Sequence, residues 1–262
     1  NARRLVDFAG YHIPVAKGAA QPLLVEQKTA EHVHGKTGLG DIELPESRLV
    51  HCTAGAYEVI QAEAERYPQE LLIVALGPLT NLALTILKYP EVKTKIKKVI
   101  LMGGSCGCGN DTPAAEFNIY ADPDAARIVF ESGIPIAMVG LDATHKAQVL
   151  PHEIEAIAAC GNKVAAVAAR ILRNSLDFCR QYGFKGAVMH DPFAMAYAID
   201  PEVMISKDYH VDVETKGEFT NGKTVVDLYN VTGKQSNASV GVDIDRDRFI
   251  TLLKEAMMSY SV

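Results

Sequence analysis

Two short segments of the sequence combine residue types that could carry out chemistry. The first lies between Gly107 and Asn118 and contains Asn110 and Glu116, after an apolar run that ends at Met102. Amide and carboxylate groups at this spacing can bracket the vicinal hydroxyls of a sugar. The same residue types also form turns and cap helices, so the spacing alone leaves a purely structural role open.

The second segment is Met189–Pro192, in which His190 and Asp191 are neighbours. A carboxylate in this position could bind a hard cation such as Ca²⁺ or Mg²⁺. A histidine beside it could supply a proton near neutral pH. An aspartate before a proline is also a common way to begin a helix, so this pair too leaves a structural role open.

The elements expected around these segments alternate between strand and helix. Continuous apolar runs predict buried strands at residues 71–76, 98–102 and 134–139. Helices are expected at residues 1–8, 54–66, 79–88, 122–131, 151–159, 163–182 and 191–198. In the C-terminal part of the chain, the sequence predicts strands at residues 209–214, 224–230 and 238–244 and a closing helix at residues 245–259. Repeated strand–helix units favour an α/β fold with a doubly wound, mostly parallel sheet and flanking helices. In such a fold we expect the chemistry in the loops that follow the strands.

Length and composition favour a large globular domain and argue against several kinds of partner. The 262 residues include 26 Lys+Arg and 32 Asp+Glu, which gives a net charge of −6, and 48% of them are hydrophobic. Because the basic residues are scattered, a nucleic-acid partner has no electrostatic support. No apolar run approaches the roughly 18 residues of a membrane span. Five cysteines are an odd and sparse set, which indicates reduced thiols and a cytoplasmic location.

Several segments, taken in chain order, resemble the inosine/uridine-preferring nucleoside hydrolases. The segments are His32–Gly35, Gly38–Gly40, Leu76–Ala83, Val99–Gly104, Ala115–Ile119, Asp122–Ala126, Val139–Thr144, His190–Pro192 and Val242–Phe249. They cover nearly the whole chain at fitting separations, so the resemblance implies one nucleoside hydrolase-like domain over residues 1–262. The family cleaves the N-glycosidic bond of ribonucleosides, which releases the base and ribose, and it holds Ca²⁺ tightly.

The resemblance implies a metal ligand and an acid in the second segment. Asp191 would bind Ca²⁺ through its carboxylate, together with the backbone carbonyl of Leu76. His190 would protonate the leaving base. The resemblance also suggests that the protein is a homo-oligomer, either a tetramer or a dimer.

The resemblance further implies a pocket for the ribose and the base. Four residues would hold or pack against the sugar: Met102, Asn110, Glu116 and Asn118. Three would line the base pocket as parts of a mobile lid: His34, Phe178 and Tyr182. The sequence does not rank purine against pyrimidine nucleosides.

The sequence departs from the family pattern at its start. The family begins with a strand and an Asp-x-Asp-Pro-Gly-x-Asp-Asp cluster, which supplies most of the calcium carboxylates and the base that activates water. The sequence has no such cluster, so we expect a domain that is incomplete at its N-terminus and lacks its first βα unit. The alternatives are an inactive fragment, a sugar-binding protein of the same fold, or a subunit whose site a partner chain completes.

Overall fold

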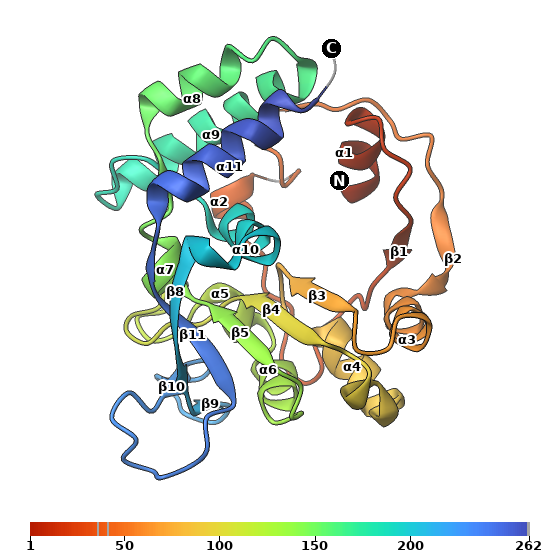
Figure 1. Cartoon of the computed structure of the whole chain (residues 1–262), viewed down its shortest axis with the longest axis vertical. Coiled ribbons are helices and arrows are strands. Elements are labelled where there is room, and N and C mark those ends of the chain that lie inside the picture. The colour runs from red at the N-terminus through yellow and green to blue at the C-terminus, as the bar shows by residue number, and fades with distance from the viewer. Residues whose placement is uncertain (36, 41, 261–262) are drawn as a thin grey trace.

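The structure of the chain is a computed structural model that describes residues 1–35, 37–40 and 42–260, without the side chains of His32 and His34. At its centre is a five-stranded sheet with the strand order β3-β4-β5-β11-β8 (Figure 1). The strands are β3 (Leu72–Ala75), β4 (Lys98–Met102), β5 (Ile136–Val139), β11 (Ala238–Ile244) and β8 (Met204–Tyr209). The first four run parallel, and β8 runs antiparallel to β11. The predicted α/β fold with a mostly parallel sheet is therefore confirmed.

Helices pack against both faces of this sheet, because successive side chains of a strand point to opposite faces. In β4, Val99 and Leu101 belong to one hydrophobic core, whereas Ile100 and Met102 belong to the other. The first core includes residues of α4 (Thr80–Lys88) and α6 (Pro123–Phe130); the second includes residues of α9 (Lys163–Gln181), α10 (His190–Ile199) and α11 (Arg246–Met258). The continuous apolar run in the sequence thus reflects a strand that is buried on both sides.

The remaining elements are short or lie outside the central sheet. The helices are α1 (Ala2–Phe8), α2 (Glu31–His34), α3 (Ala56–Arg66), α5 (Phe117–Ala121), α7 (Leu141–Thr144) and α8 (Pro151–Ala158), with 3₁₀ turns at Pro90–Thr94 and Pro201–Val203. The strands form three pairs: β1 (Val15–Lys17) with β2 (His51–Gly55), β6 (Gln148–Val149) with β7 (Ala187–Val188), and β9 (Val211–Val213) with β10 (Thr224–Val226). The predicted helices are confirmed to within two residues at their ends. None of the described helices is long and apolar enough to span a membrane.

The tail differs from the sequence prediction in two places. The strand predicted at residues 209–214 is interrupted at His210, so β8 belongs to the central sheet and β9 to a separate hairpin. The strand predicted at residues 224–230 ends at Val226. There the Asp227 carboxylate accepts bonds from the backbone N–H groups of Val231 and Thr232, both 2.8 Å long. This local bonding turns the chain and ends the strand.

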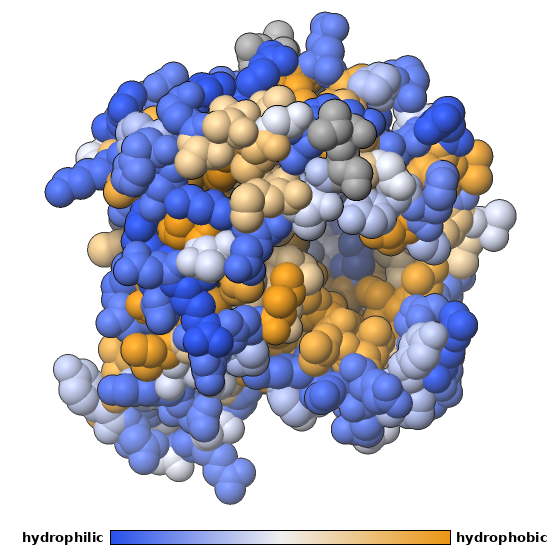
Figure 2. Space-filling model, turned by 45° about the horizontal axis from the view of Figure 1, so that its top comes forward, coloured by the Kyte–Doolittle hydropathy of each residue, from blue (hydrophilic) through white to orange (hydrophobic). Residues whose placement is uncertain are grey.

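β3 forms one edge of the central sheet, and no described strand pairs with its outer side. Leu72 within it and Leu76 just after it are 41% and 39% exposed, whereas every residue of β5 is buried. Figure 2 shows that one face of the molecule is hollowed and that hydrophobic side chains gather around the hollow. The edge of the sheet next to the predicted site is thus less covered than its centre.

Candidate active site

The residues predicted to hold ribose meet at the carboxyl end of β4. Glu116 precedes α5, and its Oε2 accepts bonds from the backbone N–H groups of Gly104 (3.1 Å) and Ile119 (3.2 Å). Asn118 donates from Nδ2 to the carbonyl of Met102 at 3.0 Å, and the same nitrogen lies 3.3 Å from the Met102 sulfur. Glu116, Asn118 and Met102 therefore form one buried cluster.

Backbone contact between two loops fixes this cluster relative to the end of β5. The backbone N–H of Leu141 donates to the carbonyl of Gly104 at 2.9 Å. A Cβ added to Gly140 would lie 2.8 Å from that carbonyl oxygen, and Gly104 has a φ of +74°. Both positions therefore require glycine, the first for close approach and the second for its backbone conformation.

His190 begins α10 on the other side of the site. Its Nδ1 lies 2.8 Å from Oγ1 of Thr144, the last residue of α7. The His190 ring also packs edge-on against the ring of His145, with the ring centroids 5.8 Å apart. The short helix after β5 thus positions the histidine that the sequence predicts to be the acid.

The two carboxylates of the site interact electrostatically. Burial raises the pKa of Glu116 to about 7, and the negative charge of Asp191 adds to this rise. The backbone N–H groups that bond to the Glu116 carboxylate act in the opposite direction. Asp191 keeps accessible surface, yet loss of hydration raises its pKa to about 6. A desolvated carboxylate that solvent still reaches is typical of a concave site.

The sequence matches one protein family along almost its whole length. A profile described as inosine-uridine preferring nucleoside hydrolase matches residues 1–251. The chain belongs to this family. The pyrimidine-specific ribonucleoside hydrolase RihA of Citrobacter koseri is 44% identical over 264 aligned positions, which cover 100% of this chain and 85% of RihA. RihA of Salmonella dublin is 45% identical and covers 95% of this chain, which spans 81% of that protein. This nucleoside hydrolase is therefore an enzyme that hydrolyses ribonucleosides to base and ribose.

Solved structures of nucleoside hydrolases have the same fold. The plant nucleoside hydrolase PpNRh1 matches with a TM-score of 0.92 and 32% identity, over 99% of this chain and 85% of that one. The purine-preferring ribonucleoside hydrolase from Gardnerella vaginalis matches with a TM-score of 0.91 and 29% identity, over 98% and 85% of the two chains. Both structures thus share one scaffold with this hydrolase at about 30% sequence identity.

The other residues predicted to bind ribose or base are placed less closely together. The Oδ1 of Asn110 accepts a bond from the backbone N–H of Phe117 at 3.0 Å, so Asn110 lies next to Glu116. The rings of Phe178 and Tyr182 pack 5.1 Å apart at the end of α9, and Tyr182 is 66% exposed. His34 ends α2, and its side chain lies outside the described part of the structure. The base-binding roles of Phe178, Tyr182 and His34 stay predictions.

Nucleoside hydrolases of this family depend on a metal, and the described residues supply part of a site for one. Asp191 is a desolvated carboxylate of the kind that binds cations, and Leu76 follows β3 at the carboxyl edge of the sheet. Among the described residues, no three His, Cys, Asp or Glu side chains are grouped to hold a metal. A Ca²⁺ ion takes six to eight oxygen ligands, so the described donors fit a hard cation in kind but not in number.

Two residues of the Val139–Thr144 segment, Asp142 and Thr144, make contacts that the sequence did not predict. Asp142 accepts a bond from the backbone N–H of Cys106 at 2.7 Å, so it supports the loop after β4. Burial and the nearby Asp142 charge raise the pKa of the Cys106 thiol to about 12, which keeps the thiol protonated. The sequence gives one reason to consider Thr144 as a site residue: it comes shortly after a predicted parallel strand.

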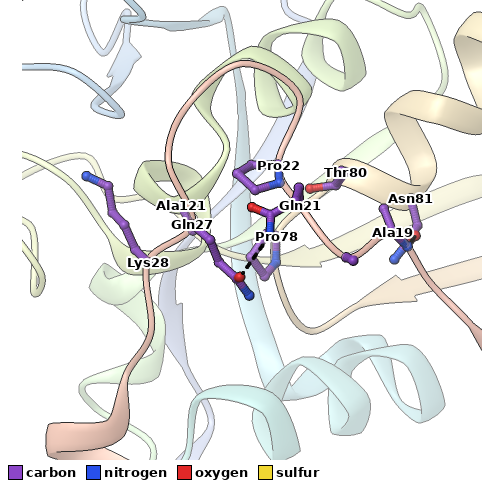
Figure 3. Close-up of a pocket in the computed structure, with 10 residues that line it drawn as sticks. Ala19, Gln21, Pro22, Gln27, Lys28, Pro78, Thr80, Asn81 and Ala121 are labelled. Atoms are coloured by element: carbon purple, nitrogen blue, oxygen red, sulfur yellow. Dashed lines mark hydrogen bonds between the residues drawn. The ribbon is translucent and has the colours of Figure 1, made fainter.

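A separate pocket lies at the start of α4 (Figure 3). The backbone N–H of Ala19 donates to Oδ1 of Asn81 at 2.8 Å, and Nε2 of Gln21 donates to Oε1 of Gln27 at 3.3 Å. None of the residues predicted to bind substrate or metal lines this pocket. The first of these bonds attaches the early loop to α4, and the second lies within that loop.

Proposed function

We propose that this nucleoside hydrolase cleaves the N-glycosidic bond of pyrimidine ribonucleosides and acts more slowly on purine ribonucleosides. One observation supports the catalytic site above all: Glu116, Asn118 and Met102 form one buried cluster at the carboxyl end of β4. The pyrimidine preference is supported by the RihA relatives, which are 44–45% identical to this chain. The purine-preferring hydrolase of known structure is 29% identical.

The residues of the chain supply charge, orientation and a proton. As the bond from ribose to the base nitrogen breaks, positive charge develops on the sugar, and the carboxylates of Glu116 and Asp191 stabilise it. Asn110, Glu116 and Asn118 hold the ribose hydroxyls. His190 gives a ring proton to the base as the bonding electron pair leaves with it. Water then adds to the ribosyl carbon and loses a proton, which replaces the proton that His190 gave up, so the products are the free base and ribose.

The base pocket that we propose contains Phe178, Tyr182 and His34. The contacting rings of Phe178 and Tyr182, tilted by 47°, support this proposal, because they place aromatic surface at an exposed helix end. A planar base gains about 1–3 kcal/mol from stacking on an aromatic ring. Mobile elements of this kind can close over a bound nucleoside.

The metal that we propose is Ca²⁺, because the predicted ligands, the Asp191 carboxylate and the Leu76 carbonyl, are hard oxygen donors. No step of the mechanism above depends on it, since the described donors are too few to define its position. We also propose a cytoplasmic enzyme that assembles as a homotetramer or dimer. Light scattering after size-exclusion chromatography measures the assembly directly, and a monomer would contradict it.

Ribose release from uridine, cytidine and inosine tests the proposed reaction in the full-length protein. We expect both pyrimidine nucleosides to be hydrolysed with a kcat/KM at least about tenfold above that of inosine, a difference of about 1.4 kcal/mol. A preference for inosine would overturn the base assignment. Ribose binding without hydrolysis of any nucleoside would instead support a sugar-binding protein of this fold.

A further inference from the structure

The backbone that carries His190 is anchored, so the remaining freedom of this residue is in its ring. The preceding strand β7 pairs with β6, and the backbone N–H of Met189 donates to the carbonyl of Ala147 at 2.9 Å. The Oε1 of Gln148 accepts bonds from the N–H groups of Lys185 and Gly186, both 3.0 Å long. The segment that follows β5 therefore fixes where α10 begins.

The ring has two different nitrogens, and a half-turn about the Cβ–Cγ bond puts a ring carbon in the place of each of them. Thr144 contacts Nδ1 at 2.8 Å, which leaves Nε2 on the opposite side of the ring. A hydroxyl both donates and accepts, so it can bond to Nδ1 before and after the ring gives up a proton. The ring of His145 lies edge-on to the ring of His190, with the centroids 5.8 Å apart, and restricts its rotation from another side.

Thr144 is held firmly enough to fix the orientation of the His190 ring. It is fully buried, and its backbone N–H donates to the carbonyl of Gly140 at 3.0 Å. Its own carbonyl accepts a bond from the backbone N–H of Ala147 at 3.0 Å. A β-branched side chain also has few χ1 rotamers.

We propose that Thr144 is a positioning residue for catalysis: its hydroxyl holds Nδ1 of His190 so that Nε2 delivers the proton to the leaving base. This inference rests on the proposed role of His190 as the acid. Thr144 itself touches neither substrate nor metal in this proposal.

Variants of Thr144 separate the hydroxyl from the packing of the side chain. Thr144→Val replaces the hydroxyl by a methyl group. Thr144→Ser and Thr144→Ala both lose the methyl group and differ only in the hydroxyl, so this pair decides the question even if the valine variant does not fold. Thr85→Val is the matched control, because Thr85 is equally buried and bonds within α4, to the carbonyl of Asn81.

Steady-state kinetics of the full-length enzyme with uridine and p-nitrophenyl riboside test the proposal. We expect Thr144→Val and Thr144→Ala to lower kcat for uridine by about 10- to 100-fold, with KM changed less than about threefold. Both variants should hydrolyse the nitrophenyl riboside within about threefold of wild type, because nitrophenolate leaves without a proton. Thr144→Ser and Thr85→Val should resemble wild type on both substrates.

Equal losses on the two substrates, or a serine variant as slow as the alanine variant, would overturn the positioning role. His190→Ala, measured alongside, separates this failure from failure of the acid role. If His190→Ala slows only uridine while the Thr144 variants do not discriminate, only the positioning inference is wrong. If His190→Ala slows hydrolysis of both substrates equally, the acid role of His190 is wrong, and the positioning role of Thr144 is wrong as well.

Discussion

At the scale of single residues, the effect of replacing His190 should depend on how easily the leaving group departs without a proton. We expect His190→Ala to lower kcat for a nucleoside by about 10²–10⁴-fold and to change hydrolysis of p-nitrophenyl riboside far less. His152→Ala is the control, because this histidine is exposed in α8. Equal losses on the two substrates would show that His190 does not act as the acid.

The Asp191 carboxylate should matter whatever the leaving group. Asp191→Ala removes a predicted metal ligand and one of the two interacting carboxylates, so we expect it to abolish hydrolysis of nucleosides and of p-nitrophenyl riboside alike. Parallel assays of the two substrates measure this. A variant that lost activity only on nucleosides would assign Asp191 to leaving-group chemistry.

Glu116, which we propose to act in catalysis, should reduce stability at alkaline pH. Folding raises the pKa of Glu116 from 4.5 to about 7, so the ionised carboxylate lowers the free energy of unfolding above pH 7. This loss of stability becomes smaller as the pH falls from 7 towards 4.5. Glu116→Gln should therefore unfold at higher denaturant concentration than wild type at pH 8, by about 2 kcal/mol, and the gain should shrink at pH 5. Activity should fall at least about 100-fold.

Urea unfolding in EDTA at both pH values measures this effect without a bound metal. Glu91→Gln, which removes an exposed carboxylate, provides the comparison. A loss of stability in Glu116→Gln at pH 8 would contradict the expected cost of burying this charge.

The sequence identified the principal polar residues, and the structure supplied their geometry. Glu116, Asn118 and Met102 meet because their segments follow the same strand, which the apolar run at residues 98–102 predicts. The contact of Thr144 with His190 joins positions 46 residues apart, and no local pattern predicts it. The same holds for the influence of Asp191 on Glu116, two residues that are far apart in the sequence.

At the scale of elements, the strongly periodic helices and the fully buried strands were predictable from the sequence. Most of the elements that were missed are short: α2, α5, α7 and the pairs β1–β2 and β6–β7 contain two to five residues per element, whereas β8 contains six. Segments of this length carry too little periodicity to separate them from loops. Tertiary contacts stabilise them, such as the bonds that Glu116 makes at the start of α5.

Asp122 connects three elements and should be a major determinant of stability. It is fully buried, and its carboxylate accepts bonds from Leu23 N–H (2.9 Å), the Thr80 hydroxyl (2.6 Å) and Ala125 N–H (3.2 Å). Asp122→Ala leaves these donors unpaired, and we expect a loss of about 3 kcal/mol in the free energy of unfolding. Asp245→Ala, which removes one cap bond at α11, should cost about 1 kcal/mol. Similar losses in the two variants would contradict the connecting role of Asp122.

At the scale of the whole molecule, the sheet is covered unevenly from its centre to its edge. Every residue of β5 is buried, whereas β3 is half-buried and has no described partner on its outer side. Hydrogen exchange of the 262-residue chain should therefore be at least about tenfold faster in β3 than in β5. Equal protection of the two strands would show that a subunit or a further segment covers the edge.

The close approach of Gly104 and Gly140 restricts how this enzyme can evolve. The loop that we propose to hold ribose and the helix that contacts His190 meet through backbone atoms, where no side chain has room to vary. Mutation can therefore alter sugar recognition and proton donation there only at the cost of the contact itself. We therefore expect changes in base preference to occur at peripheral positions such as the exposed Tyr182, which we propose to line the base pocket. A lineage could thus exchange pyrimidine for purine substrates while its reaction centre stays constant.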